Sequence, residues 1–365
     1  MKKVVVVGIL PPPVHGMATV NEFMKEELRS RNAKVEVINL SPGTLSSTMA
    51  SHGRKMFRVA FGLCRYVSLA VQGKVGAVYI GLSGGKGQLY DMLFIFVARL
   101  SGTKLFIHHH SFAYVDYRSI LAGLAITLAG RGATHIVLCD QMRIRIERTY
   151  GRKLTATVLS NFAFALDTWL PKGRARLRCR TIGYLSNISP QKGIIQFLEL
   201  ASRIRALRLD LGIIVAGPFE NPDVEKSVSA KLVQIGDIEY RGAVYGKDKQ
   251  TFFDDIDLII FPSQYAHEAE PVTVIEALTV GVPVIATDRG CLPTLVSQDF
   301  GLVISTGGDF VELAVKQLRS WLEHPGDYSK ASLLAAQYAS CCRGSARKSL
   351  SGLCDNILKS CSIPR

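Results

Sequence analysis

The sequence predicts an α/β protein with two doubly wound domains, each built on a parallel sheet. Short runs rich in valine, isoleucine and leucine alternate with amphipathic stretches along nearly the whole chain, which is typical of this fold class. The 365 residues, 48% of them hydrophobic, are enough for two ordinary cores. Residues 161–180 interrupt the alternation and are rich in arginine, as expected of a connector. We therefore predict domains at residues 1–165 and 175–344.

The first domain opens with residues 3–10, a continuous β-branched run that predicts a buried parallel strand. A loop, PPPVHGMA, and a helix from about residue 19 to residue 31 follow it. The loop lacks the GxGxxG pattern of dinucleotide-binding proteins, which argues against a dehydrogenase. Its single glycine, Gly16, either lets the backbone approach a phosphate closely or serves only a tight turn.

The rest of the first half alternates in the same way, with strands expected at residues 35–40, 77–81, 104–108 and 135–139. Between the first two of these, residues 51–74 place five cations among apolar side chains: Arg54, Lys55, Arg58, Arg65 and Lys74. This pattern predicts a basic amphipathic helix. It is either an interfacial helix that rests on anionic lipid or an ordinary surface helix packed on the sheet.

The positive charge of the chain lies entirely in its N-terminal half. Residues 1–174 hold 23 Lys and Arg against 9 Asp and Glu, whereas the remainder holds 21 of each. Such asymmetry predicts an anionic partner for that half, namely a membrane surface, lipid phosphate or nucleic acid. No nucleic-acid-binding motif is recognisable, so nucleic acid is disfavoured. No apolar run reaches the roughly 18 residues that span a bilayer, and we expect no signal peptide before the first strand. We expect a cytoplasmic protein, peripheral to the inner face of the membrane.

Three histidines, His108, His109 and His110, end a strand at the edge where α/β sheets bind ligands. Because successive side chains of a strand point to opposite faces, at most two of them share a direction. A metal site is disfavoured, because carboxylate or cysteine partners are missing from this strand end. We expect no metal, and which histidine faces the ligand stays open.

The second domain opens with TIGYLSNISPQKG. Ser189 and Pro190 predict a helix start, with Lys192 in its first turn. A cation there opposes the helix dipole, so it predicts that an anion binds between the lysine and the helix end.

Residues 261–290 hold two carboxylates, Glu268 in a predicted loop and Glu276 on a predicted helix. Pro271 fits the first helical position. This placement leaves the amides of Val272, Thr273 and Val274 as unpaired donors at the positive end of the helix dipole, which is an anion site made from backbone.

The segment PSQYAHEAEPVTVIEALTVGVPVIAT resembles the Glu-x7-Glu signature of the retaining glycosyltransferases of family 4, the glycosyl transferases group 1. The resemblance extends through VVVVGILPPPVHGMATV, HHHSF, YLSNISPQKG, AGP and TDRGC, in the order and spacing of that family. It implies the GT-B fold, in which two Rossmann-like domains face each other across a cleft and the last helix, at about 345–360, packs back on the N-terminal domain. The N-terminal domain would bind the acceptor and the C-terminal domain the nucleotide sugar.

The resemblance also implies roles for site residues. His110, with His109 as second choice, would contact the donor near the reacting centre. Glu276 would accept hydrogen bonds from the ribose hydroxyls, and Glu268 would hold hydroxyls of the transferred sugar. Lys192 and the backbone from Pro271 to Thr273 would stabilise the departing diphosphate, with Gly16 a further donor contact. Tyr184 stands where similar proteins usually carry an arginine, which leaves more of that charge to Lys192.

The predicted function is a metal-independent, cofactor-free retaining transfer of a sugar from a nucleoside diphosphate to an acceptor. The acceptor expected is a saccharide or a lipid-linked glycan of bacterial surface polysaccharide, such as O-antigen, capsule or exopolysaccharide. The resemblance implies same-face attack. In the alternative, a double displacement, Glu268 would be the nucleophile. Two alternatives stay open: a nucleotide-sugar epimerase of GT-B fold, and a nucleic-acid-binding or anion-binding protein. The sugar and the nucleobase are not predicted.

Overall fold

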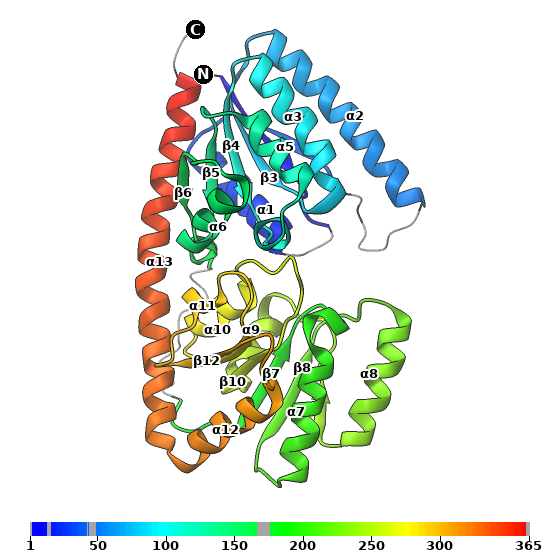
Figure 1. Cartoon of the computed structure of the whole chain (residues 1–365), viewed down its shortest axis with the longest axis vertical. Helices are drawn as coiled ribbons and strands as arrows, with labels where there is room; N and C mark the ends of the chain where they lie inside the picture. Colours follow the sequence, from blue (N-terminus) through cyan, green and yellow to red (C-terminus); the bar gives the residue numbers. More distant parts are fainter. Residues whose placement is uncertain (1, 13–15, 42, 44–48, 166–175, 363–365) are drawn as a thin grey trace. The chain divides into compact units, whose positions relative to one another are not determined.

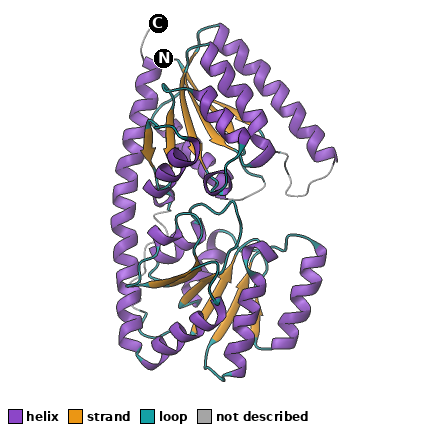
Figure 2. Cartoon of the chain, viewed as in Figure 1, coloured by secondary structure: helices purple, strands orange, loops and turns teal. Residues whose placement is uncertain are grey.

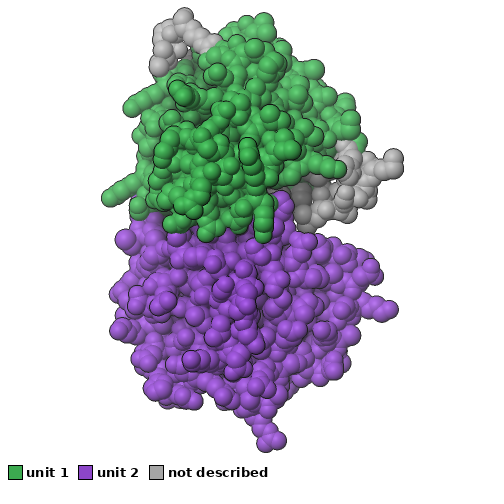
Figure 3. Space-filling model, in the orientation of Figure 1, with its two compact units in different colours: residues 1–164, 345–365 green, residues 165–344 purple. Residues whose placement is uncertain are grey.

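The computed structural model describes residues 2–12, 16–41, 43, 49–165 and 176–362 (Figure 1). The chain folds into two compact units, residues 1–164 with 345–365 and residues 165–344 (Figure 3). Strands and helices alternate through both (Figure 2). Among the described helices, none is both long and apolar enough to cross a bilayer.

The first unit contains a six-stranded, fully parallel sheet in the order β2-β1-β3-β4-β5-β6. Its strands are β1 (Lys3–Gly8), β2 (Val35–Asn39), β3 (Val75–Leu82), β4 (Lys104–His109), β5 (Thr134–Val137) and β6 (Ala156–Val158). Its helices are α1 (Gly16–Ser30), α2 (Met49–Val71), the 3₁₀ turn η1 (Gly85–Gly87), α3 (Gln88–Leu100), α4 (Ala113–Asp116), α5 (Ile120–Ala129), α6 (Asp140–Tyr150) and the 3₁₀ turn η2 (Asn161–Phe164).

The centre of this sheet is buried on both faces. Val4 to Val7 of β1 have no exposed surface, and all eight residues of β3 are buried. A parallel sheet covered by helices on both faces requires such continuous apolar strands. The five strands predicted for this half are confirmed within two residues at each end. Strand β6 was not predicted, because its three residues are too few to show a pattern and each is only half-buried.

The second unit contains another fully parallel sheet, in the order β12-β11-β10-β7-β8-β9. Its strands are β7 (Thr181–Leu185), β8 (Gly212–Ala216), β9 (Ile238–Tyr240), β10 (Leu258–Phe261), β11 (Val284–Thr287) and β12 (Gly301–Ile304). Its helices are the 3₁₀ turn η4 (Pro190–Lys192), α7 (Ile194–Ala206), α8 (Pro222–Ile235), α9 (Gly246–Asp255), α10 (Val272–Thr279), α11 (Leu292–Leu295), α12 (Phe310–Glu323) and α13 (Pro325–Ser362).

The order of this sheet has a functional consequence. Counted within the unit it reads 3-2-1-4-5-6, and the chain reverses direction across the sheet between β7 and β10. In open α/β sheets, ligands bind outside the carboxyl ends of the strands at such a switch point. The loops after β7 and β10 are therefore where a ligand of this unit should bind.

Helix α13 is one continuous element that begins in the second unit and whose last residues count with the first. Within the first unit, the Lys2 amide donates to the carbonyl of Cys361 at 3.0 Å, and Arg31 forms an ion pair with Asp355 at 3.2 Å. A Cβ on Gly76 would lie 2.6 Å from the Cα of Cys361, so a glycine at the start of β3 lets the helix approach the sheet closely.

Candidate active site

The loops after β7 and β10 are in close contact at the switch point of the second unit. Gly193 ends η4 with φ +82°, and a Cβ there would lie 2.0 Å from the carbonyl oxygen of Pro262. Only glycine tolerates both the conformation and the contact. The Gln264 amide also donates to the carbonyl of Gln191 at 2.9 Å. Two segments distant in sequence thus form one surface.

Lys192 and Glu268 meet on this surface. The hydroxyl of Ser189 accepts a hydrogen bond from the Lys192 amide and caps η4, as predicted, but Lys192 ends this short turn and α7 begins after it. The Nζ atom of Lys192 lies 2.7 Å from Oε2 of Glu268 and 4.4 Å from the centre of the Tyr265 ring. The hydroxyl of Ser263 donates to the same Oε2 at 2.8 Å. The two predicted site residues, which come from separate segments, therefore neutralise each other.

The pair is mostly shielded from water. The Glu268 side chain is 9% exposed and that of Lys192 is 21% exposed. Beside them, the ring of His267 packs 5.2 Å from that of Tyr265. Partial burial and then the charge of Lys192 lower the pKa of His267, so the ring is neutral at pH 7. Sequence reasoning had singled out neither Tyr265 nor His267.

The start of α10 differs from the prediction in two respects, the position of Pro271 and the pairing of the Val274 amide. Pro271 is the N-cap, with φ −69° and ψ 120°, and Val272 is the first helical residue. The Val274 amide donates to the Pro271 carbonyl at 3.1 Å, so the prediction of a free Val274 amide is wrong. Within the described residues, the amides of Val272 and Thr273 donate to no other group. Two backbone donors remain at the positive end of the helix.

Glu276 has a partner that the sequence did not indicate. Its Oε2 lies 2.5 Å from Nζ of Lys249, on α9, and only 12% of its side chain is exposed. Burial raises the pKa of Glu276, and the charge and hydrogen bond of Lys249 oppose that rise. Lys249 thus helps to keep this carboxylate ionised.

The three consecutive histidines of the first unit have different surroundings. His108 and His109 are fully buried, whereas His110 is partly exposed. His109 uses both ring nitrogens inside the unit, Nδ1 with the Tyr114 hydroxyl at 3.0 Å and Nε2 with Nδ1 of His135 at 2.9 Å. No ring nitrogen of His109 remains for a donor, which argues against the second choice.

His110 is the least buried histidine of the run, although its Nε2 atom is buried. Its ring centre lies 4.0 Å from that of His108, whose Nδ1 is hydrogen-bonded to the Tyr79 hydroxyl at 2.7 Å. Burial is the main cause that lowers the pKa values of His108, His109 and His135, the last to about 4, so all three are neutral at pH 7. The neutral ring of His108 therefore packs against that of His110.

Gly16 begins α1 and is exposed, and a Cβ there would meet nothing within 4 Å. Residues 13–15 of the predicted phosphate loop lie outside the described residues. The role of Gly16 stays a prediction. Among the described residues, no group of three or more histidine, cysteine or carboxylate side chains could hold a metal ion, and metal independence likewise stays a prediction.

Residues 167–336 match the family model of Glycosyl transferases group 1. The lipopolysaccharide 1,2-N-acetylglucosaminetransferase of Salmonella typhimurium is 31% identical over 120 residues, which are 31% of each chain. The lipopolysaccharide core biosynthesis mannosyltransferase LpsB of Rhizobium meliloti is 29% identical over 131 residues, 34% of this chain and 36% of LpsB. The chain thus matches about a third of the length of these relatives. The matched residues lie in the second unit and include Lys192, Glu268 and Glu276.

The crystal structure of HepE from Anabaena, in complex with UDP and glucose, superposes with a TM-score of 0.73 at 16% identity. The superposition covers 98% of this chain and all of HepE. The fold is GT-B. The predicted α/β fold class is therefore confirmed over nearly the whole chain.

Proposed function

We propose that this GT-B chain is a retaining glycosyltransferase that takes its sugar from a nucleoside diphosphate and needs neither metal nor cofactor. One observation carries the proposal. A lysine, a carboxylate and two helix-start amides lie on the loops after β7 and β10, in the unit that matches Glycosyl transferases group 1. HepE, which shares the fold, is in complex with UDP and glucose, and this supports a nucleotide sugar as co-substrate.

Glu276 holds the ribose of the donor in this proposal. A carboxylate accepts two hydrogen bonds at once, which suits a vicinal diol. The buried side chain must be ionised to do so, and Lys249 at 2.5 Å favours the ionised form. Lys249 therefore acts through Glu276 as a positioning residue.

Lys192 and the amides of Val272 and Thr273 act on the leaving group. When the bond between the sugar C1 and the diphosphate oxygen breaks, negative charge grows on the diphosphate. Donors fixed beforehand at that place stabilise the transition state. When the donor binds, its diphosphate displaces the Lys192 ammonium from Glu268. The carboxylate of Glu268 then accepts hydrogen bonds from hydroxyls of the transferred sugar. The acceptor hydroxyl then attacks C1 from the same face and passes its proton to the departing diphosphate, so the anomeric configuration is retained. His110 is proposed to contact the transferred sugar.

The acceptor that we propose is a lipid-linked glycan of a bacterial surface polysaccharide, reached at the inner face of the membrane. Two relatives are named for lipopolysaccharide synthesis, which supports a surface glycan. The excess of cations in residues 1–174, 23 against 9 anions, supports an anionic surface or lipid phosphate as neighbour.

The test is to incubate the protein with single UDP-sugars and GDP-sugars, with and without saccharide acceptors, and to determine the products by NMR. We expect a glycoside with the anomeric configuration of the donor. A glycoside of inverted configuration would contradict the retaining mechanism. An altered sugar formed without any acceptor would instead identify an epimerase. Binding of nucleic acid without any sugar chemistry would favour the nucleic-acid-binding alternative.

A further inference from the structure

Exposed apolar side chains gather on three neighbouring helices of the first unit. The part of the chain that the structure describes has nineteen large hydrophobic side chains that are exposed, and twelve of them lie between Met56 and Leu124. They come mainly from α2, α3 and α5, and α3 packs against both of the others (Figure 1). Exposed apolar side chains concentrated on neighbouring helices indicate an interaction site. We use the name apolar helix face for the surface formed by Phe57, Phe61, Leu93, Phe96, Leu100 and Ile120.

Helix α3 carries an outward apolar stripe in addition to its core stripe. Leu89, Leu93, Phe96 and Leu100 follow at spacings of four, three and four residues, so they share one side of the helix. Between 42% and 73% of each of these residues is exposed. The opposite side buries Phe94 and its neighbours against the sheet. Because a surface helix ordinarily turns polar residues outward, packing within the unit does not account for this stripe.

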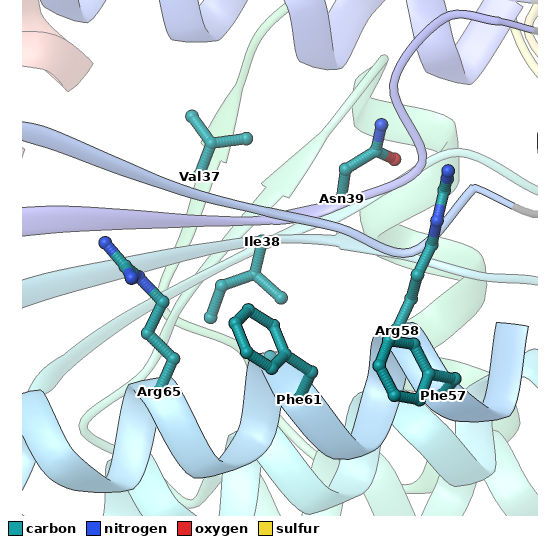
Figure 4. A pocket seen from close by; sticks show the side chains of 8 residues that line it. Val37, Ile38, Asn39, Phe57, Arg58, Phe61 and Arg65 are labelled. Carbon is teal, nitrogen blue, oxygen red and sulfur yellow. The ribbon is translucent and has the colours of Figure 1, made fainter. Parts of the chain in front are cut away.

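Helix α2 adds an aromatic pair flanked by cations. The rings of Phe57 and Phe61 stack at 6.4 Å, although the two residues are 72% and 62% exposed. They line a cavity of about 260 Å³ against β2, with Arg58 and Arg65 on either side (Figure 4). A Cβ on Gly62 would lie 2.4 Å from Ile38, so the helix already lies as close to β2 as it can. The aromatic rings are thus held at the surface.

Cations outnumber acids around this face, although Arg65 is itself paired with Glu36 of β2. Residues 49–129 contain nine Lys and Arg but two acids, Asp91 and Asp116. Asp91 is fully buried and accepts a hydrogen bond from the Ser83 amide at 2.7 Å, and Asp116 forms an ion pair with Arg145 at 2.9 Å. Helices α2, α3 and α5 therefore present apolar side chains and cations without an exposed acid.

The geometry points to insertion of the apolar helix face into an anionic phospholipid bilayer. Such a bilayer offers acyl chains to the apolar side chains and phosphates to the cations beside them. A second copy of the chain fits less well, because a symmetric contact would bring the cations of both copies together. The inference goes beyond adsorption by charge, since it assigns an apolar, salt-resistant part of the binding to α3 and α5. It does not rest on the transfer reaction.

The test places single tryptophans on the face and measures their depth in vesicles. Phe96→Trp and Ile120→Trp are the probes, and Val233→Trp, at an 84% exposed position of α8 in the second unit, is the matched control. The signal is taken as the difference from the unsubstituted chain. With phosphatidylglycerol vesicles we expect a blue shift and quenching by acyl-brominated lipid for both probes and neither for the control. Equal quenching of all three, or of none, would overturn the inference.

A second variant separates insertion from adsorption and from self-association. Phe96→Glu with Leu100→Glu should weaken partitioning into the vesicles by about tenfold or more, even at high salt, because two apolar side chains no longer enter the bilayer. Val233→Glu should not. Unchanged partitioning of the double variant, or a blue shift of the probes without vesicles accompanied by dimer formation, would contradict insertion. Transfer to a soluble saccharide acceptor should continue in the double variant. A negative result for membrane insertion would therefore not contradict the proposed transferase activity.

Discussion

The ion pair of Lys192 and Glu268 can be tested by a double-mutant cycle. The two substitutions should partly compensate each other in stability but not in catalysis. Lys192→Met removes the cation but keeps most of the side-chain volume, and Glu268→Gln removes the charge but keeps an oxygen for Ser263. Removing one partner of a fully buried pair costs about 3–5 kcal/mol, because the other charge is left without compensation. Lys192 keeps 21% of its side chain in water, so we expect about 2–3 kcal/mol for Lys192→Met.

The two readouts of the cycle should diverge. In urea unfolding, the double variant should lose less free energy than the sum of the single variants, by about 1–2 kcal/mol, because no unpaired charge remains. In transfer kinetics, Lys192→Met should cost about 2–4 kcal/mol in kcat/KM, by analogy with one oxyanion donor, and the double variant should not recover it. If Glu268→Gln restores the activity of Lys192→Met, the lysine only neutralises Glu268, and its role at the diphosphate is refuted.

Three further predictions concern other parts of the site and the core. Glu276→Ala should raise the donor KM with little change in kcat. Lys249→Met should move the acid limb of the pH profile of KM to higher pH, because the pKa of Glu276 then rises further. An unchanged pH profile would show that Lys249 does not act on Glu276. His135 has a pKa of about 4 in the folded chain and an ordinary pKa in the unfolded chain. The free energy of unfolding should therefore fall as the pH drops below about 6.5, by about 2 kcal/mol at pH 5. His135→Gln should reduce this loss in urea unfolding. EDTA should leave transfer unchanged, and dependence on added Mg²⁺ or Mn²⁺ would show that the metal-independent mechanism is wrong.

The sequence predicts elements well where one segment contains its own signal. The valine run of β1 reads as a buried strand because both faces of that strand are covered, and Ser189 caps a turn through atoms three residues away. Lys192 and Glu268 were each recognised from their local pattern. The direct contact between Lys192 and Glu268 was not predicted, because it depends on β7 and β10 being neighbours in the sheet.

Features that depend on the neighbours of an element were missed. Lys249 reads as a solvated lysine of an amphipathic helix until α9 is placed beside α10. The partner of His109 follows from the pairing of β4 with β5, which sets Ile107 opposite His135. The outward stripe of α3 has the periodicity of a core stripe, and only exposure in the folded unit tells them apart. Periodicity shows which residues share a side of an element but not what covers that side.

The central claim is that the loops after β7 and β10 bind the diphosphate of a nucleotide sugar through Lys192. The most direct measurement is the melting temperature of the chain and of Lys192→Met with a panel of UDP-sugars and GDP-sugars. A donor at a hundred times its Kd should stabilise the folded chain by about 2.7 kcal/mol. We predict that at least one donor raises the melting temperature of the unsubstituted chain and that Lys192→Met loses most of the rise at the same concentration. An equal rise in both proteins, or no rise with any donor, would contradict the account.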